Sequence, residues 1–321
     1  MGGLGGPLVM KTAFVFPGQG AQAPGMGRDL ATTLPVSREI FATADQALAF
    51  EISALCFEGS AGDLALTENT QPAVLTVSVA AWCALAARGV EPQATAGHSL
   101  GEYSAHVAAG TISFADAVRA VRARGRFMQE AVPVGHGAMA AILGLDLEKV
   151  REVCDAVADH QIVEAANINA PGQVVLAGHA GAVQRAIAAC RAAGARRAVE
   201  LDVSAPFHSS LMKPAADRLA PILEEIPFSD PGVPVYTNVD AEPVTRGEAA
   251  RDALLRQVTA PVRWHELVER MAADGFDTFV EIGPGKVLSG LTRRIRRDLK
   301  TVQVSDPEGV DRAVELLGAS S

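Results

Sequence analysis

Short runs of apolar residues that end in glycine or proline loops recur along this chain and constrain its fold. Residues 12–16 are followed by Pro17-Gly18, and the last run leads into Gly283-Pro284-Gly285. A run in which apolar residues follow one another, rather than alternate with polar ones, is typical of a strand buried on both faces. Helical stretches such as 73–88 lie between the runs, which predicts an α/β fold with a mainly parallel sheet. The runs are residues 12–16, 94–97, 233–238 and 276–281.

The middle of the chain has a different order of elements. Strands and helices alternate there as β-α-β-β-α-β, which predicts a ferredoxin-like unit. Because this unit lies between two stretches of the α/β pattern, we expect an inserted subdomain at 132–209. The large domain is then 11–131 and 210–321, and 1–10 is expected to be a disordered extension or a cloning remnant. The expected elements are strands at 137–144, 162–167, 173–178 and 196–203 and helices at 147–158 and 180–193.

Composition excludes several classes of function. With 28 Lys and Arg against 37 Asp and Glu, the formal charge of −9 disfavours general nucleic-acid binding. No apolar stretch is long enough for a membrane span, and the first residues lack the basic segment of a signal peptide. The four cysteines have no metal-ligand spacing, so we expect no metal and a reducing cytoplasm.

The pentapeptide Gly97-His-Ser-Leu-Gly101 matches G-x-S-x-G between an expected strand and an expected helix. Small neighbours allow Ser99 the strained backbone that exposes its hydroxyl as a nucleophile. The N-terminus of the helix points at this serine, so the N–H of Leu100 is a candidate oxyanion donor.

A serine nucleophile needs a base, and His208 is the best placed of seven histidines. It follows the last strand of the insert, where the chain returns to the large domain, and Pro206 fixes the backbone before it. On the residues alone, a packing role for His208 is an equal alternative. In α/β-hydrolases an acid precedes a histidine near the C-terminus. Here residues 209–321 follow His208 and no Asp stands out before it, which disfavours that fold.

Taken together, the ordered motifs of this chain resemble one family. They match the malonyl-CoA:acyl carrier protein transacylases of fatty-acid synthesis and the similar free-standing acyltransferases of polyketide pathways. The resemblance runs from about Lys11 to about Arg297, and its one departure is Ala21, where serine is commoner. The motifs are Phe16-Pro-Gly-Gln-Gly-Ala-Gln22, Thr70-Gln-Pro-Ala73, Gly97-His-Ser-Leu-Gly-Glu-Tyr103, Arg124-Gly-Arg-Phe-Met-Gln129, Asn169-Ala-Pro-Gly-Gln173, Pro206-Phe-His-Ser209, Arg256-Gln257, Pro261-Val-Arg-Trp264 and Glu281-Ile-Gly-Pro-Gly285.

The resemblance implies a fold and a catalytic machinery. The fold is an α/β-hydrolase-like core with a ferredoxin-like insert. Ser99 matches the acylated serine, His208 the general base, and Gln257 the glutamine whose carbonyl orients the histidine. Gln19 and Leu100 match the backbone donors of the oxyanion hole. No bound cofactor is implied, since a CoA thioester and carrier-protein phosphopantetheine are the substrates.

The resemblance also implies acyl selection and a partner. Arg124 matches the arginine that holds the malonyl carboxylate, and the ring of Phe207 would crowd an α-methyl group. A helix over 288–299 carries four arginines around an apolar stripe, as a solvated face or as a docking surface for an acidic carrier protein. These arginines are Arg293, Arg294, Arg296 and Arg297.

We therefore expect a cytoplasmic, monomeric malonyl-CoA:acyl carrier protein transacylase that binds neither nucleic acid nor membranes. Transfer of another extender unit, such as methylmalonyl or ethylmalonyl, is an alternative. A hydrolase of acyl thioesters on the same scaffold is a second, and a non-catalytic carrier-binding protein is a third. The sequence does not assign the carrier protein to fatty-acid or to polyketide synthesis.

Overall fold

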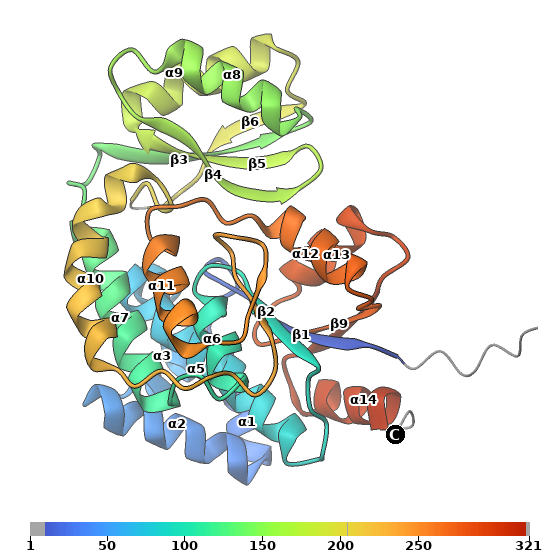
Figure 1. Cartoon of the computed structure of the whole chain (residues 1–321). Helices are drawn as coiled ribbons and strands as arrows, with labels where there is room; N and C mark the ends of the chain where they lie inside the picture. Colours follow the sequence, from blue (N-terminus) through green and yellow to red (C-terminus); the bar gives the residue numbers. More distant parts are fainter. Residues whose placement is uncertain (1–9, 204, 319–321) are drawn as a thin grey trace, which may run out of the picture.

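The computed structural model describes residues 10–203 and 205–318, and it contains two separate sheets (Figure 1). The larger sheet has the strand order β10-β9-β1-β2-β7-β8. All neighbouring strands are parallel except β7 and β8, which confirms the mainly parallel sheet. Its strands are β1 (Thr12–Phe16), β2 (Ala94–Gly97), β7 (Val235–Tyr236), β8 (Pro243–Val244), β9 (Thr278–Ile282) and β10 (Lys300–Val304).

Helices cover both faces of this sheet, and every residue of its central strand β1 is buried. In β1, Ala13 and Val15 belong to one buried cluster and Phe14 and Phe16 to another. The first cluster is completed by α12 (Trp264–Ala273) and α13 (Val287–Ile295). The second is completed by α1 (Arg28–Thr33), α5 (Thr67–Ala86), α6 (Gly101–Ala108) and α14 (Pro307–Gly318).

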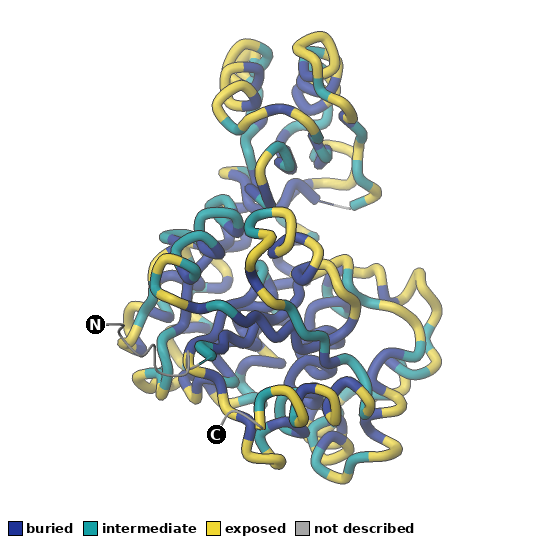
Figure 2. Tube along the Cα trace, turned by 90° about the vertical axis from the view of Figure 1, so that its right-hand side faces the viewer, coloured by how far each residue is buried: buried dark blue, intermediate teal, exposed yellow. Residues whose placement is uncertain are grey.

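A third group of helices packs around α5, α6 and α7 and supports the site. There α7 (Phe114–Glu130) lies along α5, and its N-terminus is capped by Ser113, whose hydroxyl accepts a hydrogen bond from the amide of Asp116. The group contains α2 (Pro35–Leu48), α3 (Ile52–Glu58), α4 (Ala61–Ala65), α10 (Lys213–Glu225) and α11 (Gly247–Gln257), and a 3-10 turn over Ser210–Met212 precedes α10. Figure 2 shows the buried residues concentrated in the middle of this large body.

The smaller sheet is antiparallel, with the order β4-β5-β3-β6. With two helices between its strands, it has the ferredoxin-like topology that the sequence predicts. It joins the large body through main-chain hydrogen bonds between Val262 and the neighbours Ala166 and Ile168 in β4. The boundaries 132–209 stay a prediction. The elements are β3 (Gly137–Leu143), α8 (Leu147–Val157), β4 (Val163–Ala170), β5 (Gln173–His179), α9 (Ala180–Ala192) and β6 (Arg197–Glu200).

Two expected helices differ at their ends. The helix expected to begin at residue 73 begins at Thr67, and Pro72 lies inside it. The arginine-bearing helix expected over 288–299 ends at Ile295, because Arg296 is already extended and β10 begins at Lys300. Leu299 is therefore buried ahead of a strand and does not extend the helical stripe.

Two further expectations concern the chain's ends and membranes. Residues 1–9 of the expected extension lie outside the described residues. Within 10–203 and 205–318, no helix has the length and apolar character needed to cross a bilayer.

Candidate active site

Ser99 lies on a sharp turn between β2 and α6, and its backbone is left-handed, with φ of 52°. A side chain at Gly97 would collide with the backbone of Gly101, and one at Gly101 with the carbonyl of Phe16. Only glycines therefore allow the turn to close against the end of β1. Ser99 therefore has the strained backbone that the pentapeptide predicts, and it is partly buried.

The loop after β1 packs directly on this turn. A side chain at Gly18 would collide with the carbonyl of His98, so the next residue, Gln19, lies close to the serine turn. The Gln19 side chain is exposed, and its Nε2 donates to Thr67 Oγ1 over 3.3 Å. Leu100, the other expected oxyanion residue, is buried directly before α6.

His208 contacts the hydroxyl of Ser99, with 2.6 Å between Nε2 and Oγ. Its Nδ1 lies 2.9 Å from the main-chain carbonyl of Gln257. Since a carbonyl can only accept, Nδ1 carries the proton and Nε2 is free to accept from Ser99. Burial and then the charge of Arg124 lower the pKa of His208 to about 3, so the ring is neutral at pH 7.

Arg124 extends from α7 into the same site and is only 1% exposed. Its guanidinium donates to Gln71 Oε1 at 2.8 Å, to Gln257 Oε1 at 2.9 Å and to Ser99 Oγ at 3.2 Å. Nε has no hydrogen-bond partner among the described residues, and none of their carboxylates forms an ion pair with this arginine. The site therefore presents a buried positive charge beside the serine hydroxyl.

The sequence reasoning missed three polar residues that hold this arrangement. Gln71 lies in a quoted motif, but no role was predicted for it. Asn238 accepts from the amide of Ser99 at 2.6 Å and donates to the carbonyl of Gly97 at 2.6 Å. Glu102 accepts from Gln257 and from the amide of Asn238, each at 2.8 Å.

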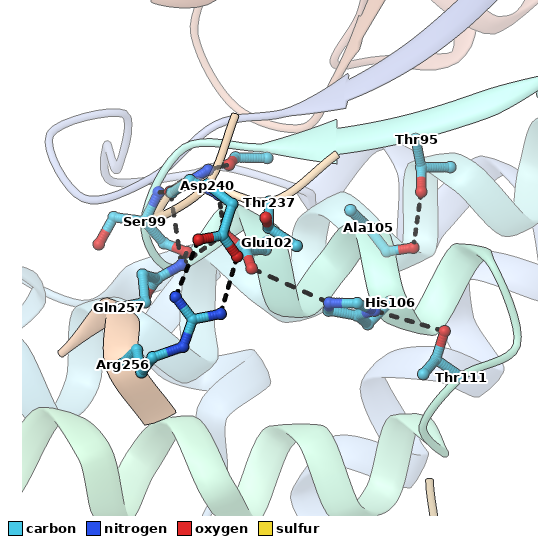
Figure 3. Close-up of polar contacts among 12 residues, drawn as sticks. Thr95, Ser99, Glu102, Ala105, His106, Thr111, Thr237, Asp240, Arg256 and Gln257 are labelled. Atoms are coloured by element: carbon cyan, nitrogen blue, oxygen red, sulfur yellow. Dashed lines mark hydrogen bonds and ion pairs between the residues drawn. The ribbon is translucent and has the colours of Figure 1, made fainter. Parts of the chain in front are cut away.

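Figure 3 shows how Ser99, Gln257 and Glu102 lie around the turn. The Nε2 of Gln257 donates to the carbonyl of Ser99 at 3.0 Å as well as to Glu102. Gln257 therefore supports the serine turn with its amide and the histidine with its main chain. A polar residue on an otherwise buried helix face is the signal that could have found Glu102.

Phe207 and His98 directly precede His208 and Ser99 in the sequence. Phe207 is 7% exposed within the main apolar core. The Nε2 of His98 lies 2.8 Å from the Oδ1 of Asn169 in β4, and its ring packs on Trp264 at the start of α12.

The four arginines near the C-terminus do not form one helical face. Arg293 and Arg294 lie on the last turn of α13, and Arg294 donates to Gln173 at 2.6 Å. Arg296 follows the helix and pairs with Asp298 at 2.7 Å and Glu269 at 3.5 Å. Arg297 is exposed. The expected docking helix is therefore shorter, and one of its charges is already paired.

The fold and site define an α/β protein in which a serine on a strand-to-helix turn contacts a neutral histidine, an arrangement typical of acyl-transferring enzymes. Comparison with known proteins gives the family. Residues 13–309 match the model of the acyl transferase domain, and the chain belongs to this family.

Relatives cover nearly the whole chain. The malonyl CoA-acyl carrier protein transacylase of Escherichia coli K12 is 53% identical over 305 residues, which are 95% of this chain and 99% of that protein. The protein of the same name from Bacillus subtilis is 49% identical over 308 residues, covering 96% and 97%.

Solved structures agree with this match. A malonyl-transacylase in complex with its type II polyketide synthase acyl-carrier protein superposes with a TM-score of 0.93 at 50% identity, covering 95% of this chain and 99% of that one. The transacylase of Coxiella burnetii gives a TM-score of 0.95 at 42% identity, covering 97% and 98%.

Proposed function

We propose that this protein transfers a malonyl group from malonyl-CoA to the phosphopantetheine thiol of an acyl carrier protein, through a malonyl ester of Ser99. One observation carries the proposal. The Ser99 hydroxyl lies within hydrogen-bond distance of both a neutral histidine and a buried arginine that pairs with no carboxylate of residues 10–203 and 205–318. The activities named for the relatives support it.

In the first half-reaction, His208 Nε2 accepts the Ser99 proton as Oγ attacks the thioester carbonyl. The tetrahedral intermediate collapses, the C–S bond breaks, and His208 returns the proton to the departing CoA sulfur. The Gln257 carbonyl holds Nδ1–H and stabilises the transient imidazolium. In the second half, the carrier thiol gives its proton to His208 and attacks the ester carbonyl. The bond from the acyl carbon to Ser99 Oγ then breaks, and His208 returns the proton to Oγ.

The oxyanion of both intermediates forms beside the N-terminus of α6. We assign its stabilisation to the main-chain amides of Leu100 and Gln19, because the Ser99 amide is already bonded to Asn238. Donors fixed by the fold need no reorganisation when charge develops on the oxygen. The same donors serve both half-reactions.

Selection of the malonyl group is assigned to Arg124 and Phe207. The guanidinium binds the malonyl carboxylate, which an acetyl group lacks, so an acetyl group leaves the buried charge without an anion. The ring of Phe207, buried next to His208, disfavours the α-substituents of methylmalonyl and ethylmalonyl units.

The proposal includes the partner and setting. The exposed Arg293, Arg294 and Arg297 form the docking surface for an acidic carrier protein, and Arg296 contributes less because it is paired. We propose a cytoplasmic monomer that needs no metal or bound cofactor and binds neither nucleic acid nor membranes.

Incubation with radiolabelled malonyl-CoA, with and without carrier protein, tests the proposal. Label should appear on the enzyme and then move to the carrier. Release of free malonate would instead indicate a hydrolase, and unlabelled protein a non-catalytic scaffold. A panel of carrier proteins then assigns the pathway.

A further inference from the structure

A buried carboxyl group lies behind the proposed acyl site and takes no part in the steps above. Arg124 donates to the Oε1 of Gln257 at 2.9 Å, and the Nε2 of the same amide donates to Glu102 Oε2 at 2.8 Å. Both the guanidinium and the carboxyl group are at most 1% exposed. One side-chain amide therefore connects a buried positive charge to a buried acid.

The second oxygen of Glu102 has room for a proton. Neither Oε1 nor the Nε2 of His106 has a hydrogen-bond partner among the described residues, and the two atoms face each other over 4.0 Å (Figure 3). Burial lowers the pKa of His106 to about 3, so this ring is neutral. A proton on Oε1 would leave the bonds that Oε2 accepts unchanged.

Groups on neighbouring elements shift the pKa of Glu102 in opposite directions. Burial raises its pKa to about 7, although the hydrogen bonds from Asn238 and Gln257 and the charge of Arg124 act to lower it. The negative charge of Asp240, which follows β7, also raises the pKa of Glu102. Asp240 is itself paired with Arg256 of α11 at 2.7 Å. Glu102 is therefore able to change charge near neutral pH.

We propose that Glu102 is a positioning residue that holds the Gln257 amide against Arg124 and, by gaining one proton, frees the guanidinium charge for the carboxylate of the acyl group. The inference rests on the proposed function. Ionised Glu102 balances Arg124 through Gln257, and a malonyl carboxylate would then be a second anion near one cation. Binding of malonyl-CoA, but not of acetyl-CoA, should therefore take up a proton at Glu102.

Calorimetry on the Ser99→Ala variant tests this without acyl transfer. Malonyl-CoA and acetyl-CoA are titrated at pH 7.5 in buffers of different ionisation heat, which reports the protons taken up. The CoA moiety is common to both ligands, so the difference isolates the malonyl carboxylate. We expect malonyl-CoA to take up a measurable fraction of one proton more than acetyl-CoA.

Two further variants assign the proton. Adding Glu102→Gln, which keeps an acceptor for Gln257, should abolish the difference and leave the malonyl preference independent of pH. Adding Asp240→Asn removes the neighbouring carboxylate and should retain the difference in proton uptake between the two ligands. In this variant the affinity for malonyl-CoA relative to acetyl-CoA should still fall roughly tenfold from pH 6 to 8.5.

The outcomes separate the inference from the proposed function. Equal proton uptake for the two ligands, or an uptake that persists in Glu102→Gln, would overturn the role of Glu102. If Glu102→Gln does not fold, equal uptake in Ser99→Ala alone is sufficient to reject it. Failure of the wild-type protein to form any malonyl adduct would overturn the proposed function itself.

Discussion

Replacement of Arg124 by alanine is the sharpest test of acyl selection. Within the described part of the chain, the guanidinium makes three hydrogen bonds, all to neutral groups, and its Nε–H has no partner. None of these three acceptors is an anion, so a malonyl carboxylate would supply the negative charge that pairs with Arg124.

The size of the effect follows from burial. Leaving a buried carboxylate without its cation costs about 3–5 kcal/mol. At about 1.4 kcal/mol for each factor of ten, Arg124→Ala should lower kcat/KM for malonyl-CoA by roughly two to four orders of magnitude. Transfer of an acetyl group should rise, or fall far less, because it never used that bond.

The assay is the initial rate of transfer from malonyl-CoA and from acetyl-CoA, with folding checked by circular dichroism. Arg126→Ala is the matched control, because Arg126 lies on the same helix but is exposed. Arg124→Ala also leaves the side chains of Gln71 and Gln257 with fewer partners. The ratio of the malonyl rate to the acetyl rate is therefore more diagnostic than either rate alone. A folded Arg124→Ala protein with the full malonyl preference would refute the reasoning.

Three further changes probe the nucleophile, the docking surface and the buried histidines. Ser99→Ala should abolish the malonyl mass added by malonyl-CoA in intact-protein mass spectrometry, and equal labelling would remove Ser99 from the mechanism. Reversing the charges of Arg293 and Arg294 should weaken use of the carrier protein more than self-acylation, with an effect that shrinks as salt rises; an equal loss of self-acylation would contradict docking. Folding lowers the pKa values of His106 and His208 to about 3, so below pH 6.5 the unfolded chain binds more protons than the folded one. As the pH falls through this range, each histidine therefore lowers the free energy of unfolding by about 1.4 kcal/mol per pH unit. In urea titrations from pH 6.5 to 5, His106→Asn should reduce this acid dependence, and an unchanged slope would show that the ring is protonated in the folded state.

Local sequence patterns predict the order of elements but not all of their ends. The mostly apolar run of β1 and the βαββαβ order are local signals, and both appear in the structure. The end of α13 depends on distant partners. Arg296 pairs with Glu269, and β10 pairs with β9, so the chain leaves the helix although Leu299 has the spacing to continue it.

The residues that frame the serine turn depend on contacts across the whole chain. Gln257 and Glu102 are 155 positions apart, and Asn238 and Ser99 are 139 apart. A motif search marks Ser99 and Gln257 but cannot show which buried group each one meets. Their partners become visible only when β7 and α11 are placed beside α6.

A physical signal in the sequence nevertheless points to the network. A charged side chain on the buried face of a helix is unfavourable unless the fold supplies a partner. Glu102 lies in α6, which is buried along most of its length, and Arg124 lies on the buried face of α7, at helical spacing from Val121 and Met128. Expecting them to share one network requires no motif, only the requirement that buried charges be compensated. The structure meets that requirement through the Gln257 amide, which accepts from Arg124 and donates to Glu102, instead of through a direct ion pair.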